Sequence, residues 1–469
     1  MNQLKPYPAY KNSAVPWLGN VPEHWGIVPN RASFKELKES GYPDEQMLSV
    51  TITQGVILQS SLLSDTSKKD SSNEDKSKYK LVCPGDIAYN KMRAWQGAVG
   101  SSAYRGVVSP AYIVMRPREN QHPRFFHYLF RTPAFTKEAE HWSYGISSDQ
   151  WSLRPEEFKQ IYTCVPPLPE QTAIVRYLDY MDRRIRRYIK AKKKLIALLN
   201  EQKQAIIHQA VTRGLDPNVH LKPSGVEWLG DIPEHWEVRR LRYAIIGKLT
   251  YGANVAGEYS NPEWPRYLRI TDFALDGTMR KETFCSLPPE IAKDYLLKPG
   301  DILLARSGAT VGKAFLVKPE AGKACHAGYL IRARPNPNLV NPDFLFMFTQ
   351  SAIFKAWKDS IFIIATIQNI GADKYANLYV PIPPLSEQTR ILDFINSEIE
   401  PANAAIVRAE RGIGLVREYR TRLIADVVTG KLDVRAAAAG LPEEAEALND
   451  SESVTEDDEE LPVGAINDN

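Results

Sequence analysis

The sequence predicts an α/β (α+β) protein in which one module, a small globular domain followed by a long helix, occurs twice. Three motifs recur in the same order along the chain, at offsets that drift only from 211 to 217 positions. They are Trp-Leu-Gly-x-x-Pro-Glu-His-Trp at 17–25 and 228–236, Pro-Gly-Asp-Ile at 84–87 and 299–302, and Pro-Pro-Leu-x-Glu-Gln-Thr at 166–172 and 383–389. Because the offsets change so little, the two copies differ by small insertions.

The first part of each copy predicts a compact domain of short strands and helices. Runs rich in β-branched and aromatic residues, bounded by turn residues, are typical of strands. They occur at 48–52, 107–115, 302–305 and 329–333. Two amphipathic helices are expected at 123–135 and 342–357, each beginning at or just after a proline. The segment 64–80, rich in Ser, Lys and Asp, predicts a surface loop present only in the first copy.

A long helix ends each copy. After the proline-rich segments, the positions at alternating steps of four and three from Ile174 to Gln209 are mostly apolar, as in a heptad seam. A similar seam runs from Ile399 to Val427, with a kink expected at Pro401. A helix of 40 residues is about 60 Å long. Because such a seam needs a cover, we expect the helices to pair as an antiparallel coiled coil that holds the domains at a fixed spacing. The alternative is that each helix lies on its own domain.

These patterns divide the chain into five parts. They are domain 1 at 1–168, helix 1 at 169–213, domain 2 at 214–385, helix 2 at 386–435 and an acidic tail expected to be disordered at 436–469.

Composition excludes several classes of protein. No run of about 18 apolar residues exists, and residues 1–20 lack the pattern of a secretory signal. The four cysteines are isolated, which favours reduced thiols in a cytoplasmic protein. No spacing of His or Cys predicts a metal site.

The net charge of +3 conceals an asymmetry. Residues 441–469 hold eleven acidic residues and no Lys or Arg, so the rest of the chain carries +14. Such a surplus favours a polyanionic partner, and a duplicated module suits a two-part site on double-stranded DNA.

Taken together, the motifs resemble those of the specificity subunit of Type I restriction–modification enzymes, over about residues 10–433. The duplicated motifs carry the resemblance, together with the segments 89–98, 108–112 and 303–313. The resemblance implies that the two domains are target recognition domains, related by pseudo-twofold symmetry, that read the halves of a bipartite interrupted DNA site. It implies that the helices dock two modification (methyltransferase) subunits and that restriction/translocase subunits join the full complex. It further implies that S-adenosylmethionine binds the partner methyltransferase, and that this chain is non-catalytic and holds no cofactor.

Candidate DNA-binding residues follow the Pro-Gly-Asp strand of each copy. Cations suit phosphates, and Arg suits guanine. These candidates are Lys91, Arg93, Trp95 and Gln96 in the first copy and Arg306, Ser307, Thr310 and Lys313 in the second. The alternative is a core tryptophan beside solvated cations.

A second group of candidates precedes each proline-rich segment. Asn and Gln can form paired hydrogen bonds with adenine. The group comprises Tyr144, Ser147, Ser148, Gln150 and Trp151 in the first copy and Thr366, Gln368, Asn369 and Lys374 in the second. The alternative is a polar turn that caps the following strand.

Enzymatic motifs are incomplete. The segment 308–313 lacks the first Gly and the final Ser or Thr of a phosphate-binding loop. The segments 261–264 and 341–344 carry an acid where an adenine methyltransferase has its second Pro. Asp44, Glu74 and Lys76 match a nuclease pattern, but the Glu and Lys fall in the Ser-rich loop. One non-enzymatic alternative remains open, a duplicated protein-binding scaffold without base readout.

Overall fold

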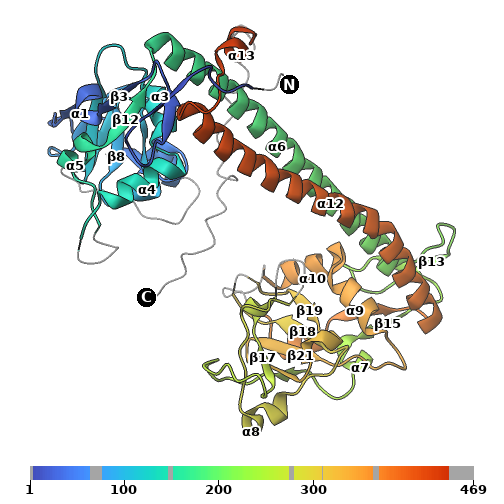
Figure 1. Ribbon diagram of the computed structural model, residues 1–469. Coiled ribbons are helices and arrows are strands. Elements are labelled where there is room, and N and C mark those ends of the chain that lie inside the picture. Colours follow the sequence, from blue (N-terminus) through green and yellow to red (C-terminus); the bar gives the residue numbers. More distant parts are fainter. Residues whose placement is uncertain are drawn as a thin grey trace. The chain divides into compact units, whose positions relative to one another are not determined.

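The computed structural model describes residues 4–63, 76–145, 151–273, 279–308, 310–362 and 369–442. The chain divides into two compact units, Met1–Lys190 with Gly412–Asn469 (unit 1) and Ala191–Arg411 (unit 2). Each unit contains one globular lobe and parts of the two long helices, α6 (Leu168–Arg213) and α12 (Leu385–Val428), which are labelled in Figure 1.

Short strands and short helices build the lobe of unit 1. Its strands are β1 (Tyr10–Asn12), β2 (Asn20–Pro22), β3 (Gly26–Pro29), β4 (Phe34–Leu37), β5 (Leu48–Thr51), β6 (Gly55–Leu58), β7 (Lys80–Val82), β8 (Ile87–Asn90), β9 (Val99–Ser101), β10 (Gly106–Val108), β11 (Tyr112–Pro117) and β12 (Tyr162–Val165). Its helices are α1 (Asn30–Ser33), α2 (Gln59–Leu63), η1 (Ala94–Gln96), α3 (Pro123–Leu129), α4 (Pro133–His141) and α5 (Pro155–Gln160), and α13 (Arg435–Ala439) also belongs to this unit.

The lobe of unit 2 repeats this plan with its own insertions. Its strands are β13 (Leu221–Pro223), β14 (Asp231–Pro233), β15 (Glu237–Arg240), β16 (Thr250–Tyr251), β17 (Arg266–Leu268), β18 (Ile302–Ala305), β19 (Ala314–Leu316), β20 (Ala324–His326), β21 (Leu330–Ala333) and β22 (Tyr379–Ile382). Its helices are α7 (Leu241–Ala244), η3 (Ile270–Asp272), α8 (Pro289–Ala292), η4 (Lys293–Tyr295), η5 (Pro319–Ala321), α9 (Pro342–Thr349), α10 (Ala352–Phe362) and α11 (Ala372–Ala376).

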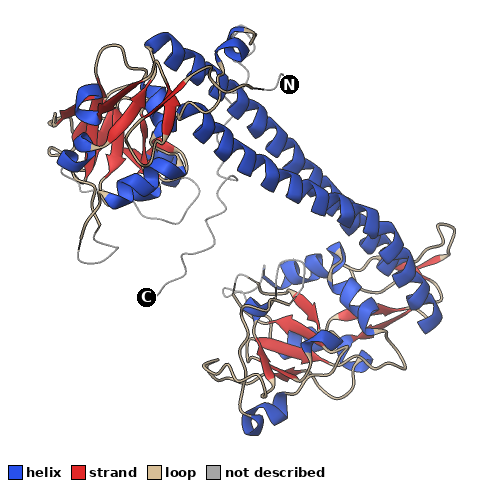
Figure 2. Ribbon diagram, viewed as in Figure 1, coloured by secondary structure: helices blue, strands red, loops and turns tan. Residues whose placement is uncertain are grey.

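The central sheets of the lobes share one topology. Four antiparallel strands lie in the order β4-β11-β8-β9 in unit 1 and β16-β21-β18-β19 in unit 2. In each lobe, helices lie against the sheets (Figure 2). The fully buried rings of Trp25 and Trp236 occupy equivalent places in the two cores. The duplicated α/β (α+β) architecture predicted from the repeated motifs is therefore confirmed.

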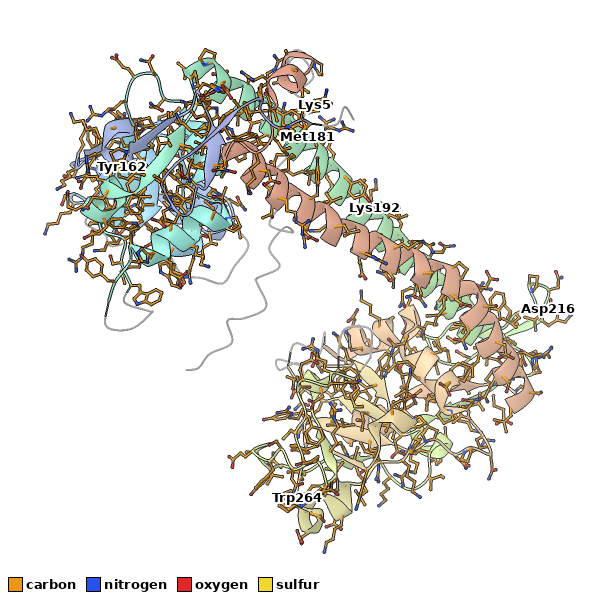
Figure 3. The ribbon with its side chains drawn as sticks, in the orientation of Figure 1. Lys5, Tyr162, Met181, Lys192, Asp216 and Trp264 are labelled. Carbon is orange, nitrogen blue, oxygen red and sulfur yellow. The ribbon has the colours of Figure 1, made fainter. Side chains whose placement is uncertain are left out.

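In unit 1 the beginning of α6 packs antiparallel to the end of α12. Met181, labelled in Figure 3, shares an apolar core with Leu423 and Val427. Asp182 accepts a hydrogen bond of 2.6 Å from Arg420. Further along α6, Gly412 leaves space for the hydroxyl of Tyr188, since a side chain at 412 would lie 3.0 Å from that oxygen.

In unit 2 the end of α6 meets the beginning of α12. Ile207, Ala210 and Val211 of α6 belong to the same apolar core as Ile391 and Ile395 of α12. The two helix ends therefore share each lobe's core, so the sequence periodicity did identify a paired seam. The predicted seam position Leu195 is exposed, whereas Ala210, one residue after the predicted Gln209, is buried.

Several predicted elements end elsewhere than the sequence pattern indicated. The helix expected at 123–135 is two helices, because Thr132 caps α4 and Pro133 begins it. Likewise, the segment 342–357 spans α9 and α10. The long helix expected to reach 435 stops at Val428, because Gly430 adopts a left-handed φ of 79°. Through Pro401, by contrast, α12 is one helix.

Parts of the predicted loop and tail lie outside the described residues, namely 64–75 and 443–469. In the described part of the chain, no helix is both long enough and apolar enough to span a bilayer. Over the same residues, no group of three or more His, Cys, Asp or Glu side chains is arranged to hold a metal ion.

Candidate nucleic-acid interface

The first and last repeated motifs bind each other within each unit. Glu170 accepts hydrogen bonds from the indole of Trp25 (2.9 Å) and pairs with His24 (2.8 Å). Glu387 pairs with His235 in the same way at 2.7 Å. These motif residues therefore attach each long helix to its lobe.

The neighbouring glutamines complete this attachment. Gln171 donates to the carbonyl of Pro166 (2.8 Å) and accepts from the backbone of His122 (2.8 Å), the residue before α3. Gln388 repeats both bonds with Pro383 and Asn341. The long helix, the proline-rich segment and the helix after the sheet are thus joined at one point in each unit.

Each Pro-Gly-Asp motif fixes the strand that leads to the candidate residues. Asp86 accepts from the backbone of Cys83 and from the guanidinium of Arg116. Asp301 does the same with Lys298 and Arg334, at 2.7 to 2.8 Å. Both aspartates are almost fully buried. The strands that follow the two aspartates therefore begin in the same register, so each residue of β8 has an equivalent residue in β18.

Lys91 and Arg306 occupy equivalent positions, directly after these strands. The carbonyl of Lys91 accepts from the backbone of Leu153, and that of Arg306 accepts from Ile370, both at 2.9 Å. Leu153 lies two residues after Trp151, and Ile370 directly follows Asn369, so each adjoins the second candidate group of its lobe. The structure therefore brings the two predicted groups together, twice, in the same geometry.

In unit 1 an aromatic pair connects the two groups. The rings of Trp95 and Trp151 meet edge to face at 5.6 Å, and the Trp95 indole donates to the carbonyl of Met92. Arg93 and Gln96 are exposed beside them. Tyr144 is exposed as well, and the guanidinium of Arg154 lies 4.7 Å from its ring centre. Ser147, Ser148 and Gln150 lie outside the described residues.

In unit 2 backbone pairing connects the groups. Ser307 pairs with Asn369 in an antiparallel bridge, and the side chain of Asn369 accepts from Nε of Arg306 at 3.4 Å. Lys374 is exposed on the short helix α11, and Lys313 is exposed before β19. Thr310 is half-buried, and its carbonyl accepts from the backbone of Lys313. Thr366 and Gln368 lie outside the described residues.

The sequence did not point to Arg131, which fixes the loops next to Trp95 and Gln96 in unit 1. Its guanidinium donates to five backbone carbonyls, those of Thr51, Ile52, Thr53, Gly97 and Val99. Burial lowers the pKa of Arg131 to about 10. This cation joins the β5–β6 turn to the loop that follows Gln96. No sequence pattern identified it, because its carbonyl partners are distant along the chain.

The sequence reasoning also missed an exposed pair of tyrosines in unit 2. Tyr251 is 42% exposed, and its ring lies 5.1 Å from the guanidinium carbon of Arg306. Tyr329 is 63% exposed, and its carbonyl accepts from the backbone of Arg306 at 2.9 Å. Strand pairing of β16 with β21 creates this arrangement.

Comparison with known proteins identifies the family. The model of the Type I restriction modification DNA specificity domain matches residues 30–197 and 276–404. The MjaVIII specificity subunit of Methanocaldococcus jannaschii is 26% identical over 59% of this chain and 64% of its own length. The EcoKI specificity subunit of Escherichia coli is 23% identical over 43% of this chain and 44% of its own length. The matched regions thus span less than two thirds of these curated relatives.

A solved structure has the same fold. It comes from work described as the structural basis of complex assembly and conformational transition of the type I R-M system. Its TM-score is 0.64 at 17% identity, covering 88% of this chain and 99% of the solved chain. With the family model matched over more than half of its residues, the chain belongs to the Type I restriction modification DNA specificity domain family.

Proposed function

We propose that this chain is the sequence-specific DNA-binding specificity subunit of a Type I restriction–modification complex. Each lobe is a target recognition domain that reads one half of a bipartite, interrupted site. The observation that carries this proposal is the repeated meeting of two candidate segments at Lys91 in unit 1 and at Arg306 in unit 2. Equivalent polar clusters on two copies of one lobe suit two half-sites of one duplex.

The proposed role is recognition rather than catalysis. The chemistry belongs to partners, namely two methyltransferase subunits that bind S-adenosylmethionine and, in the full complex, restriction/translocase subunits. Curated relatives named as specificity subunits of such enzymes support this assignment. The motif residues attach α6 and α12 to their lobes in the same way in the two copies, which suits docking of two identical partners.

We further propose that α6 and α12 pair along their length and set the distance between the half-sites. In unit 1, Asp182 faces Arg420, and Tyr188 lies beside Gly412. In unit 2, Gly214, the residue directly after α6, lies beside Glu387 of α12. In these three pairs, the facing residues are offset as they would be in a single antiparallel register, with a deviation of at most two residues. This agreement supports a continuous coiled coil.

Co-expression with a candidate methyltransferase partner, followed by methylation-sensitive sequencing, tests the function. A bipartite methylated motif with an unspecific spacer is expected. As a second measurement, DNA binding should weaken about a thousandfold or more between 50 and 200 mM salt, because several phosphates are contacted. A protein-binding scaffold would instead give no methylated motif and no steep salt dependence, and that outcome would refute the proposal.

A further inference from the structure

Arg306 is held by contacts that fix the direction of its side chain. Its backbone is bonded on both sides, because the amide donates to Tyr329 and the carbonyl accepts from Ile370. Its guanidinium lies over the ring of Tyr251, with 5.1 Å between the guanidinium carbon and the ring centre. Such cation–π contacts stabilise a cation at a partly exposed site. The side chain is therefore ordered before any ligand binds.

Tyr251 is itself fixed at both ends. Its backbone pairs with Ile331 in the central sheet. Its hydroxyl accepts from the backbone of Ala372, the first residue of α11, at 2.9 Å. The ring thus spans from the sheet to α11 and provides a rigid surface beneath the guanidinium. A flexible aliphatic side chain at 251 would offer neither the hydroxyl bond to Ala372 nor the ring face beneath Arg306.

Arg306 and Asn369 have hydrogen-bond donors left for a ligand. Nε of Arg306 can only donate, so the side-chain oxygen of Asn369 must face it, which leaves the amide NH2 of Asn369 pointing elsewhere. The two terminal nitrogens of Arg306 also only donate. Among the described residues, no carboxylate forms an ion pair with Arg306. In the major groove, guanine shows two acceptors, adenine shows one acceptor and one donor, and cytosine shows a donor.

Resting on the proposed function, we propose that Tyr251, Arg306 and Asn369 form a guanine-reading cluster in the unit 2 lobe. Arg306 forms the bidentate contact with the guanine edge, and Tyr251 is the positioning residue that holds its fork in the required plane. At the equivalent position, unit 1 has Lys91, which lacks a fork. The two half-sites therefore differ at this position, and only one has its guanine read in this way.

Three variants of the full chain, co-expressed with its methyltransferase subunits, test the cluster by methylation-sensitive sequencing. Arg306→Lys keeps the charge and removes the fork, so preference for one G·C pair in one half-site should fall roughly ten- to hundredfold. Tyr251→Leu should relax the same pair, whereas Tyr251→Phe, which keeps the ring, should relax it less. As a matched control, Tyr243→Leu removes another exposed tyrosine beside an arginine, Arg242, and should leave the motif unchanged.

The other half-site serves as the folding control in the same data. If Arg306→Lys lowers methylation equally at all sites with the motif unchanged, Arg306 has a structural role only, and the inference fails. It also fails if the motif is fully retained, if the relaxed pair is not G·C, or if both half-sites change. A wild-type complex that methylates no bipartite motif would refute the proposed function instead.

Discussion

Single buried aspartates determine how each lobe presents its candidate residues. Asp86 and Asp301 each join a turn to the end of the neighbouring strand, β11 in unit 1 and β21 in unit 2, through one backbone amide and one guanidinium. Removing either carboxylate leaves an arginine without its partner and a backbone donor unsatisfied. Such a substitution lowers the free energy of unfolding, because the arginine and the backbone amide lose their hydrogen-bond acceptor while remaining shielded from water.

Asp301→Ala is expected to destabilise unit 2 by about 3 kcal/mol, since its carboxylate is 1% exposed and accepts three hydrogen bonds. Urea unfolding of the full chain measures the change. Asp294→Ala, at an exposed position of η4, is the control and should change the free energy of unfolding by less than about 0.5 kcal/mol. Equal effects of the two substitutions would contradict this account of the motif.

His127 makes the stability of unit 1 depend on pH. Burial, together with the charge of Arg131, holds the pKa of His127 well below its ordinary value, and its buried Nδ1 has no hydrogen-bond partner among the described residues. Below about pH 6.5 the unfolded chain binds a proton that the folded lobe does not. The free energy of unfolding is therefore highest above about pH 6.5, where His127 is neutral in both states. It falls as the pH drops toward the pKa that His127 has in the folded lobe.

Unfolding in urea at pH 7.5 and at pH 5.5 checks this effect. The wild-type chain should be less stable at the lower pH, and His127→Met should reduce the difference by at most about 1.4 kcal/mol, because pH 5.5 lies about one unit below the pKa of an unfolded histidine. The exposed His141→Gln variant should keep the wild-type difference. An unchanged pH dependence in His127→Met would show that other groups cause it.

At the scale of elements, the long helices are attached to the lobes by side chains rather than by periodicity alone. Gln388 is fully buried and bonds to three backbone groups, those of Leu339, Asn341 and Pro383. It therefore holds the beginning of α12 against the beginning of α9. The repeated Glu-Gln-Thr motif has a structural explanation that its sequence alone did not reveal.

Gln388→Leu has nearly the same volume and cannot bond to these groups, so unit 2 should lose about 2–4 kcal/mol of stability. Thermal unfolding of the full chain measures the loss. The exposed neighbour Arg390→Ala serves as control and should unfold like the wild type. If Gln388→Leu also unfolds like the wild type, the bonds do not hold the helix to the lobe.

The sequence predicted the elements better than their ends. The period of the long helices, the Pro-Gly-Asp strands and the helices after prolines all appear in the structure. The single helix expected at 123–135 was wrong, because the cap at Thr132 depends on one hydrogen bond rather than on periodicity. The seam near Leu195 was also wrong, because a fixed heptad step drifts relative to a straight helix.

For the whole molecule, the proposed coiled coil predicts how the DNA spacer changes with helix length. Deleting residues 192–198 from α6 and 403–409 from α12 removes one heptad from each helix, at positions that face each other in the proposed register. The lobes should then approach by about 10 Å at 1.5 Å per residue. This distance corresponds to about three base pairs, so the methylated motif should keep both half-sites and shorten its spacer.

Methylation-sensitive sequencing of the reconstituted complex reads the spacer directly. Deletion of residues 192–198 alone mismatches the two helices and should abolish methylation, which makes it the control. An unchanged spacer in the double deletion would show that the helices do not set the distance between the half-sites.

The sequence by itself determined the duplication, the long helices and the family, because these depend on local periodicity and on motifs that recur at a constant offset. It also placed both candidate segments of each lobe. Only the tertiary structure decided that these segments meet, that Lys91 is equivalent to Arg306, and that Tyr251 lies beneath that arginine. Such contacts join residues far apart in the chain, and strand pairing and packing, which no local pattern encodes, bring them together.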